Sequence, residues 1–570
     1  MKVIDFLDAN CKNCYKCVRH CSVKAIRVRN GQAQIMKEQC ILCGHCLEVC
    51  PQNAKTFVSD LSQVKAYLRA GEKVIVSIAP SYLGILDYDK PGQVVDALHR
   101  LGFYQVRETA EGAAMVTAAY QVLLLDGTLE NMITTCCPSV NDLVEKYYPD
   151  LTPYLAPVVS PMIAHGKLIK AMYPDAKVVF LGPCIAKKEE AEGDERTRGF
   201  IDAVINFTEL EQWLLEEGIE IRSCQNRPMD NPDPGINRLY PVSGGIVSSV
   251  MLDQKIEQDY HKIYVDGLEN VIDVLNGMRE GQIKRYFIEA NVCEGGCIKG
   301  PAIDKLGVSR FKARVIIEDQ VEHIPPRHEE AAASILLDKS FYPRPVSEPH
   351  PSEEEIQTIL HSTGKYTKEQ ELNCGACGYS SCREKAIAVA QGKAEIDMCL
   401  PYAIEKARSM ANIVMEATPN MILIVDGDMR IHELNKKAED VLKIKKPAAL
   451  DRYLFEFIDH SDALSVYDSH KPILHKKVAL ETLQMTAMLI CVYIKDSDYV
   501  LCIFQDITDQ EEKKLKHYHL KMETVEMAQK VIDKQMMVAQ EIASLLGETT
   551  AETKVTLSKL RDSILFEDEE

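Results

Sequence analysis

The sequence predicts a multidomain α/β protein, and three observations lead to this class. The chain has 570 residues, which at about 150 residues per domain is too long for one core. Between residues 73 and 335, apolar strand-like runs alternate with helix-like stretches, which favours α/β units with a mostly parallel sheet. The 20 cysteines are concentrated in short clusters, and this clustering indicates metal-binding segments around the α/β part.

The expected strands are three apolar runs, KVIVSIAP (73–80), AKVVFLGP (176–183) and YFIEANVC (286–293). The stretches at 93–103 and 161–174 have the character of helices. In α/β sheets the active groups lie in loops that follow the strands. Cys184, Cys293 and Cys297 fall in such loops, so we expect a site there.

Composition excludes several classes. With 46% hydrophobic and 26% charged residues, the chain is neither a disordered protein nor a collagen-like fibre. Its formal net charge of -19 argues against nucleic acid or an anionic membrane as a partner. The N-terminus lacks a signal-peptide apolar region, and no run reaches the ~18 apolar residues of a membrane span. We therefore expect a cytoplasmic protein, in which clustered cysteines are metal ligands or catalytic thiols.

Residues 1–58 are predicted to form a bacterial-type ferredoxin domain with two [4Fe-4S] clusters. Its cysteines form two runs, at 11–21 and 40–50, in each of which two residues separate the first three cysteines and three residues precede the fourth. Pro51 follows the second run. Three such cysteines wrap one cube, and the fourth reaches the other cube. Structural zinc is the alternative, although zinc modules usually pair two C-x2-C knuckles across a long gap. The expected ligand sets are Cys11, Cys14, Cys17 with Cys50, and Cys40, Cys43, Cys46 with Cys21.

A further cysteine group lies near the middle of the chain. Residues 339–365 are predicted to be a linker, because FYPRPVSEPHPSEEEI is rich in Pro, Ser and acids. After it, a C-x2-C-x4-C run and a fourth cysteine in residues 366–405 resemble a small [4Fe-4S] domain of redox and sensory proteins. Four thiolates without histidine favour one cube over zinc. The expected ligands are Cys374, Cys377, Cys382 and Cys399.

Residues 406–510 resemble an α+β PAS domain. Two alternating strands flank a Gly-Asp turn, Asn435 is a plausible helix N-cap, and Asp506-Ile507-Thr508 closes the segment. Cys491 and Cys502 are expected to be core residues. Residues 511–570 are predicted to be a C-terminal helical output or dimerisation segment, with a short second helix after Thr549.

Three motifs in the α/β part carry a family resemblance. TTCCPS (134–139), GPCIAKKEE (182–190) and CEGGCIKG (293–300) look like the signature segments of the [FeFe]-hydrogenase family, in the family's order. APS (79–81) and SGG (243–245) match flanking segments. The resemblance covers residues 1 to about 335 and implies an H-cluster domain at 59–338.

The resemblance implies a ligand set for the H-cluster, a [4Fe-4S] cube bridged to a di-iron unit with CO, CN and a dithiolate. Lys187 matches a lysine that donates to an iron-bound cyanide, and its three N–H donors suit that anion. The cube ligands are Cys137, Cys184, Cys293 and Cys297, with Cys297 as the bridge; Ala79, Pro80, Ser81, Gly244 and Gly245 match cofactor-contacting loops.

The implied proton path is incomplete. Cys136 matches the proton-passing cysteine, and Ser160 matches a relay serine. The helix that should carry two relay glutamates reads EGAAMVTAAYQVLL, with Ala and Tyr near the expected sites. Glu108 and Glu111 are expected to be solvated acids at a helix start. Without paired carboxylates, turnover should be slow.

Gly182, Asn291 and Val140 replace larger residues of prototypical enzymes. We expect them to make the pocket around the di-iron unit smaller or more polar than usual.

The domain order resembles sensory [FeFe] hydrogenases. The expected function is sensing of hydrogen or redox state with slow reversible H2 oxidation, electrons passing through three further [4Fe-4S] clusters to the PAS module. One alternative is a turnover hydrogenase coupled to ferredoxin, and another is an iron-sulfur carrier without the di-iron unit. The expected partners are H2 and protons, ferredoxin or another redox protein, hydrogenase maturases, a kinase or phosphatase by family analogy, and a second copy in a homodimer.

Overall fold

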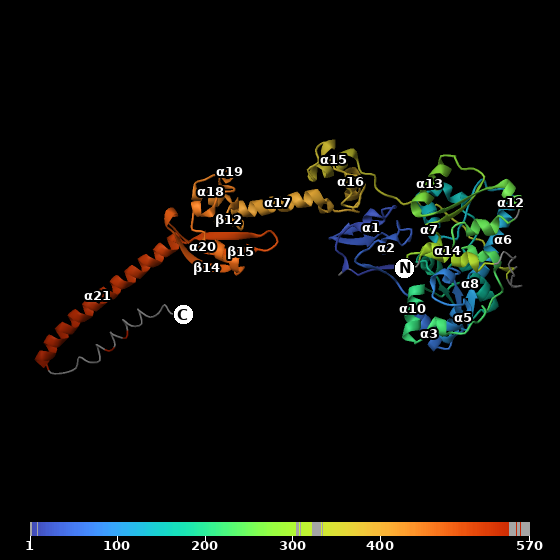
Figure 1. Cartoon of the computed structure of the whole chain (residues 1–570), viewed down its shortest axis with the longest axis horizontal. Coiled ribbons are helices and arrows are strands. Elements are labelled where there is room, and N and C mark those ends of the chain that lie inside the picture. The colour runs from blue at the N-terminus through green and yellow to red at the C-terminus, as the bar shows by residue number, and fades with distance from the viewer. Residues whose placement is uncertain are drawn as a thin grey trace. The chain divides into compact units, whose positions relative to one another are not determined.

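The computed structural model describes residues 3–7, 10–252, 254–303, 307, 309–321, 332, 334–546, 555 and 559. The chain divides into two compact units, Met1–Tyr402 and Ala403–Glu570, whose elements are labelled in Figure 1. The expected segments 1–58 and 59–338 therefore lie in the first unit, together with most of 366–405.

The N-terminal segment consists of two small antiparallel sheets and two one-turn helices. Strand β1 (Ile4–Phe6) pairs with β4 (Lys55–Phe57), and β2 (Ile26–Arg29) pairs with β3 (Gln32–Ile35). Helices α1 (Lys16–Arg19) and α2 (His45–Glu48) each follow a cysteine loop. Because each pair is short, the cysteine loops account for much of this segment.

The α/β body contains two parallel sheets, where the sequence predicts one mostly parallel sheet. The four-stranded sheet has the order β6 (Gln105–Glu108), β5 (Val74–Ile78), β8 (Lys177–Leu181), β9 (Ala203–Ile205). The second sheet has the order β10 (His261–Asp266), β11 (Tyr286–Asn291), β7 (Met132–Ile133). All five residues of β5 are buried, as expected of a parallel strand covered on both faces. The three apolar runs singled out in the sequence are thus strands β5, β8 and β11.

Helices surround these sheets (Figure 1). The longest, α6 (Ala110–Asp126), is apolar almost all round and packs against α8 (Pro161–Met172). A helix that is apolar on every side belongs in a core, and residues 110–117 of α6 are all buried, whereas Val122 and Leu125 near its end are exposed. The others are α3 (Leu61–Arg69), α4 (Tyr82–Ile85), α5 (Gly92–Arg100), α7 (Pro138–Tyr147), α9 (Ala186–Lys188), α10 (Phe207–Glu216), α11 (Gly245–Val250), α12 (Gln254–Asp259), α13 (Leu268–Arg279) and α14 (Arg310–Asp319).

The segment predicted to be a linker is in part structured and bound to the body. Residues 339–346 form a strap along α7, in which the Tyr342 N–H donates to Glu145 Oε1 over 3.0 Å and the Arg344 N–H donates to the Glu145 carbonyl over 2.7 Å. Lys339 is buried and lies 3.0 Å from Asp194 Oδ2. Helix α15 (Glu353–Ser362) follows, with a capping box at Ser352. The Pro- and Ser-rich composition did not predict these contacts, because the partner residues lie far away in the sequence.

The last part of the first unit contains the third cysteine group. Helix α16 (Cys382–Ala390) packs against α15. Helix α17 (Leu400–Ala417) begins directly after Cys399 and crosses the boundary between the two units.

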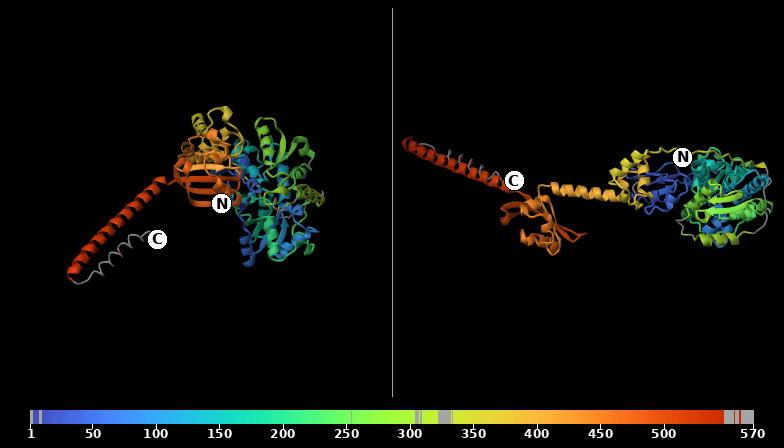
Figure 2. Two further views of the ribbon diagram at one scale, coloured as in Figure 1. Left: turned by 60° about the vertical axis from the view of Figure 1, so that its left-hand side comes forward. Right: turned by 90° about the horizontal axis from the view of Figure 1, so that it is seen from above.

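The second unit is built on a five-stranded antiparallel sheet, visible in the left view of Figure 2. Its order is β13 (Ile431–Leu434), β12 (Met421–Val425), β16 (Tyr499–Asp506), β15 (Met485–Ile494), β14 (Ile473–Leu480). Three helices, α18 (Lys436–Leu442), α19 (Lys446–Ala449) and α20 (Ser461–Ser469), follow β13 in the chain. Asn435 caps α18, its side chain accepting from the Ala438 N–H over 3.0 Å, so this predicted cap is confirmed.

Cys491 and Cys502 are buried in the core of this sheet, as expected. They are direct cross-strand partners on β15 and β16, with their Sγ atoms 2.9 Å apart. The sequence predicts that both are buried but not that they face each other, because their identity alone does not determine the register of the two strands.

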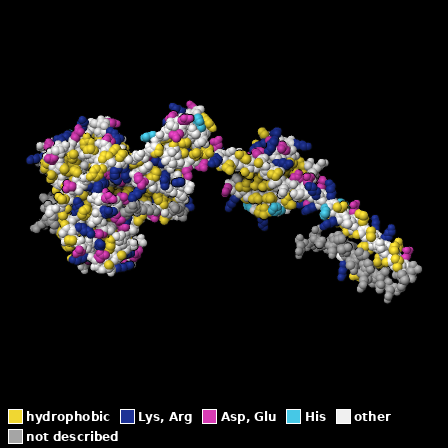
Figure 3. Space-filling view, turned by 180° about the vertical axis from the view of Figure 1, so that it is seen from behind, with side chains coloured by type: hydrophobic (Ala, Val, Ile, Leu, Met, Phe, Trp, Pro, Cys, Tyr) yellow, Lys and Arg dark blue, Asp and Glu magenta, His cyan; other side chains and the backbone are white. Residues whose placement is uncertain are grey.

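The longest described helix of the second unit is α21 (Thr508–Leu546). Figure 3 shows hydrophobic side chains along this helix, and Leu515, Met527, Val531 and Ile542 are among the exposed ones. The predicted second helix after Thr549 lies outside the described residues. Across the described part of the chain, no helix has the length and apolarity needed to cross a membrane.

Substitution of Glu145 tests whether the strap depends on a buried carboxylate. Its side chain is fully buried and also accepts from Arg196 Nη1 over 2.6 Å. Burial would raise its pKa, but Arg196 and the Tyr342 N–H together bring the pKa below its ordinary value. We expect Glu145→Gln to lower the free energy of unfolding by about 3 kcal/mol and to speed hydrogen exchange in residues 339–346.

The pKa of Glu145 is lower in the folded than in the unfolded chain. Its contribution to the free energy of unfolding is therefore complete above the unfolded pKa of about 4.3 and is lost as the pH falls through the folded pKa. The wild-type advantage should therefore shrink in acid. Glu354→Gln, an exposed acid on α15, is the control. Equal exchange rates in the wild type and Glu145→Gln would contradict this account.

Candidate functional site

The carboxyl ends of strands from both parallel sheets supply the signature cysteines. Cys137 follows β7 and is the N-cap of α7, Cys184 comes three residues after β8, and Cys293 comes two residues after β11. Cys297 opens a short 3-10 helix after the Gly295-Gly296 turn. Parallel strands end at one edge of a sheet, so residues 160 positions apart reach the same place.

The four thiols interact with one another and are half-buried. Cys297 lies within charge–charge range of Cys184 and Cys137, and Cys293 lies within range of all three others. Burial raises the pKa of the Cys184 thiol to about 11. Iron binds thiolates, so loading must release protons from these groups.

Two side chains that the family resemblance implies are well placed for an anionic ligand. The Ser81 hydroxyl is fully buried, and among the described residues it has no hydrogen-bond partner. Lys187 Nζ donates to the Cys136 carbonyl over 3.0 Å and to Glu190 Oε2 over 2.7 Å, which uses two of its three donors. Ala79 and Pro80 precede Ser81 in the same buried turn after β5. A buried hydroxyl without a partner fits a bound acceptor such as cyanide.

Cys136 lies between the cysteine site and helix α6. Its Sγ is 3.4 Å from the Tyr120 hydroxyl, which also accepts from the Thr135 N–H over 2.9 Å. Burial raises the pKa of the Cys136 thiol to about 12, although the Tyr120 hydrogen bond lowers it. The thiol is therefore held protonated beside a phenol, without a carboxylate as its hydrogen-bond partner in the described structure.

Ser160 has a partner that the sequence reasoning missed. Its hydroxyl donates to Glu190 Oε2 over 2.9 Å, the oxygen that also binds Lys187. Glu190 stands three residues after Lys187, so its spacing on one helical face could have indicated the pair.

The expectation that Glu108 and Glu111 are solvated was wrong. Both are buried, with exposed fractions of 0% and 3%. Glu108 accepts from Arg238 Nε over 2.8 Å, and Glu111 binds Arg107 and His165. The sequence reasoning failed because the cationic partner of Glu108 lies 130 positions away.

Glycines fix the loops beside the site. A Cβ on Gly245 would lie 1.8 Å from the Leu239 carbonyl oxygen, so only glycine fits there. The Gly244 and Val247 N–H groups donate to the buried Glu289, whose pKa burial raises to about 7. At Gly182 the Phe180 ring occupies the space of a side chain, 2.6 Å from an ideal Cβ. The Phe180 ring therefore fills the space that a larger side chain at position 182 would occupy.

The ferredoxin-like segment brings its cysteines together in the two expected sets. Cys11, Cys14, Cys17 and Cys50 line one small cavity. Cys40, Cys43 and Cys46 each interact with Cys21, and burial raises the pKa of Cys43 to about 12. The third group, Cys374, Cys377, Cys382 and Cys399, also lines one cavity.

In the described residues, no group of three or more His, Cys, Asp or Glu converges as ligands of a single metal ion. A four-iron cube places its sulfur ligands farther apart than one tetrahedral ion does, and it takes four thiolates. The donor sets therefore fit cubes. When bound, such cubes supply electron transfer.

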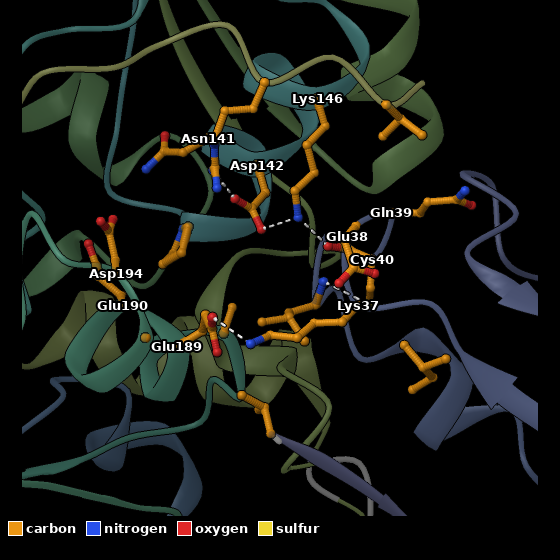
Figure 4. Close-up of a pocket in the computed structure, with 18 of the residues that line it drawn as sticks. Lys37, Glu38, Gln39, Cys40, Asn141, Asp142, Lys146, Glu189, Glu190 and Asp194 are labelled. Carbon is orange, nitrogen blue, oxygen red and sulfur yellow. Dashed lines mark hydrogen bonds and ion pairs between the residues drawn. The ribbon is translucent and has the colours of Figure 1, made fainter. Parts of the chain in front are cut away.

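A larger cavity of about 1190 Å³ lies between the ferredoxin-like segment, α7 and the strap (Figure 4). Charged side chains face it in pairs, such as Lys146 with Asp142 at 3.0 Å and Lys37 with Glu189 at 3.9 Å. Gln39 Oε1, Asn141 Oδ1, Glu189 Oε2 and Glu190 Oε1 are buried on its wall without a hydrogen-bond partner in the described structure. These acceptors fit ordered water.

Comparisons with known proteins agree with this arrangement. Residues 72–301 match the family model described as "Iron only hydrogenase large subunit, C-terminal domain". A 4Fe-4S dicluster model matches residues 3–51, and an Fe-S cluster model matches residues 370–401. Residues 72–301 are thus similar to the C-terminal domain of iron-only hydrogenases, and a segment similar to iron-sulfur domains lies on each side of them in the chain.

Two hydrogenases and an assembly factor illustrate the range of relatives. Iron hydrogenase 1 of Clostridium pasteurianum is 28% identical over 450 residues, 60% of this chain and 76% of that protein. The NADP-reducing hydrogenase subunit HndD of Solidesulfovibrio fructosivorans is 26% identical, over 58% of this chain and 67% of that protein. The cytosolic Fe-S cluster assembly factor narfl of Danio rerio is 20% identical, over 46% of this chain and 79% of that protein.

The cysteine assignment can be tested by iron content. We expect Cys293→Ala to lose one cube's iron, because a cube that lacks a thiolate is held weakly. Cys224→Ala is the matched control, since Cys224 is also buried but lies outside all four groups. Iron and sulfide should be measured per chain after reconstitution. Unchanged iron in Cys293→Ala would contradict the assignment.

Proposed function

We propose that this chain is an [FeFe] hydrogenase of low turnover that reports hydrogen or redox state to its second unit. One observation carries the proposal. The complete thiolate set with Lys187 and Cys136 is present, while the hydroxyl of Tyr120 stands beside Cys136 where fast relay requires an acid. The site can hold the cofactor, but the passage of protons away from it is impaired.

The side chains of this site have distinct parts in the proposed reaction. Lys187 and the Ser81 hydroxyl orient anionic ligands of the cofactor. Cys136 holds a proton at Sγ, next to the site. Tyr120 is a weak acid, because burial raises its pKa well above the ordinary value, so it contributes little to moving that proton. Glu190 neutralises Lys187 and accepts from Ser160, which fixes both donors in place.

The second unit supplies the sensory part of the proposal. Its antiparallel sheet order, the Asn435 cap and the Asp506–Thr508 turn support a PAS-like module. The Thr508 N–H and hydroxyl both donate to Asp506 Oδ1, over 2.9 and 2.6 Å. This fixes the start of α21 to the end of β16. A shift in the sheet would thus be passed to the helix and to a partner protein, which we take to be a kinase, a phosphatase or a second copy of the chain.

A second candidate is an iron-sulfur protein that never receives the di-iron unit. The similarity to a cytosolic Fe-S cluster assembly factor favours it. Ser81 weighs against it, because its buried, partnerless hydroxyl fits a cofactor beyond the cubes.

The experiment is hydrogen oxidation and evolution by protein made with the hydrogenase maturases. We expect infrared CO and CN bands together with turnover at least 100-fold below that of iron hydrogenase 1, since general acid relay contributes about 10²–10⁴-fold. Cys136→Ala should abolish the remaining turnover and leave the bands intact. Tyr120→Phe should change the rate less than fivefold.

Two outcomes would decide against the proposal. Turnover equal to that of iron hydrogenase 1 would favour an enzyme that works with ferredoxin. Absence of CO and CN bands after maturation would favour the carrier.

A further inference from the structure

Two buried lysines stand beside the third cysteine group. Lys365 and Lys385 have exposed fractions of 8% and 5%. Both line the same cavity as Cys374, Cys377, Cys382 and Cys399, and none of the described residues that line it is an acid. Lysine is almost never buried without a partner, and the negative charge within reach of these two is that of the cysteine thiolates and of a cluster that they would hold.

The side chain of Lys365 is fixed toward the site. Its Nζ lies 3.4 Å from Cys399 Sγ, 3.1 Å from the Thr363 carbonyl and 3.0 Å from the Thr363 hydroxyl oxygen. Lys385 Nζ donates to the Ile396 carbonyl over 2.9 Å and interacts with the thiols of Cys399 and Cys377. Burial lowers the Lys385 pKa, and these thiolates oppose that effect.

The cube expected at Cys21, Cys40, Cys43 and Cys46 has different neighbours. Lys24, which acts on Cys21, is only half-buried, and Lys146, which acts on Cys40, is already paired with Asp142. Glu48 adds negative charge near Cys43. The buried Lys55 acts on Cys46 but is shared with Cys17 and Cys50 of the first set. Among the described residues, the cavity of the third group is lined by two buried lysines and no acid, whereas the cavity of the first set, also without an acid, has one buried lysine, Lys55, and the exposed Lys12 and Lys16.

We propose that Lys365 and Lys385 raise the reduction potential of the third cube above that of the Cys21 cube, so that electrons released by hydrogen oxidation collect on the third cube. Reduction adds one electron to a cube and no proton, which makes it more negative by one charge. Buried cations close by stabilise that charge in a medium of low polarity. This inference rests on the proposed function, in which hydrogen yields two protons and two electrons.

Electrons have a direct protein path to the third group. Helix α1 connects Cys17 of the first set with Cys21 of the second, and Arg19 on α1 donates to the Gly375 and Ala376 carbonyls over 3.3 and 3.2 Å. Lys24 Nζ donates to the Gly378 carbonyl over 3.2 Å.

The same interface has a hydrophobic core and a carboxylate contact. Val18 and Tyr379 share one core. Glu395 accepts from the Asn30 and Gly31 N–H groups over 2.6 and 3.2 Å. The loop that holds the third cube therefore packs on the helix between the other two.

The test is a redox titration of the fully loaded chain, followed by electron paramagnetic resonance. In the wild type the third cube should be reduced before the Cys21 cube. Lys365→Met and Lys385→Met should each make reduction of the third cube about tenfold less favourable, which is 59 mV for one electron. Lys385→Arg should retain most of the potential, because it keeps the charge.

Lys368→Met is the matched control, since Lys368 is an exposed lysine of the same segment. In this variant the equilibrium constant for reduction of the third cube should change less than twofold. Iron content shows whether each variant still holds the cube. Unchanged potentials in both methionine variants, or reduction of the Cys21 cube first, would overturn the inference. Absence of a third cube would overturn it and the proposed cluster set together. Absence of hydrogen turnover, with the potentials shifted as expected, would refute the proposed enzyme and leave the role of the lysines standing.

Discussion

The first unit depends on one constraint, that thiolates from distant parts of the chain must meet out of contact with water. Burial disfavours the charged thiolate, and the raised pKa values of Cys184 and Cys40 express that cost. Parallel strands from two sheets bring the cysteines to a common edge, and glycines such as Gly245 allow the backbone to approach closely. The body is thus shaped around groups that are unfavourable to bury until metal binds them.

Charge is balanced locally in this unit. The net charge of -19 says little about the interior, where Glu145, Glu111 and Glu190 each have a cationic partner. Lys365 and Lys385 are exceptions of the opposite sign, because thiolates stand where carboxylates would be expected. A buried charge is costly unless it is paired, so the two lysines stabilise the fold most when these thiols are deprotonated.

Much of this organisation could be predicted from the sequence, since cysteine spacing and apolar runs are local patterns. The strands β5, β8 and β11, the Asn435 cap and the burial of Cys491 and Cys502 follow from such patterns.

Contacts between distant residues could not be predicted in this way. Glu108 and Glu111 looked solvated because Arg238 and His165 are remote in sequence. The strap looked like a linker because Glu145 lies about 200 positions before Tyr342. The division of the body into two sheets likewise depends on pairing that single residues do not reveal.

The position of Cys399 has a mechanical consequence. This cysteine, a proposed cluster ligand, immediately precedes α17, the helix that carries the chain from the first unit into the second. A hydrogen-bonded helix resists twisting, so a small rotation at its first residue is passed along it, whereas a flexible loop would absorb it. Each residue of an α-helix advances the direction of its side chains by about 100°. The length of α17, more than its composition, would then determine which face of the next segment a rotation at the metal ligand reaches.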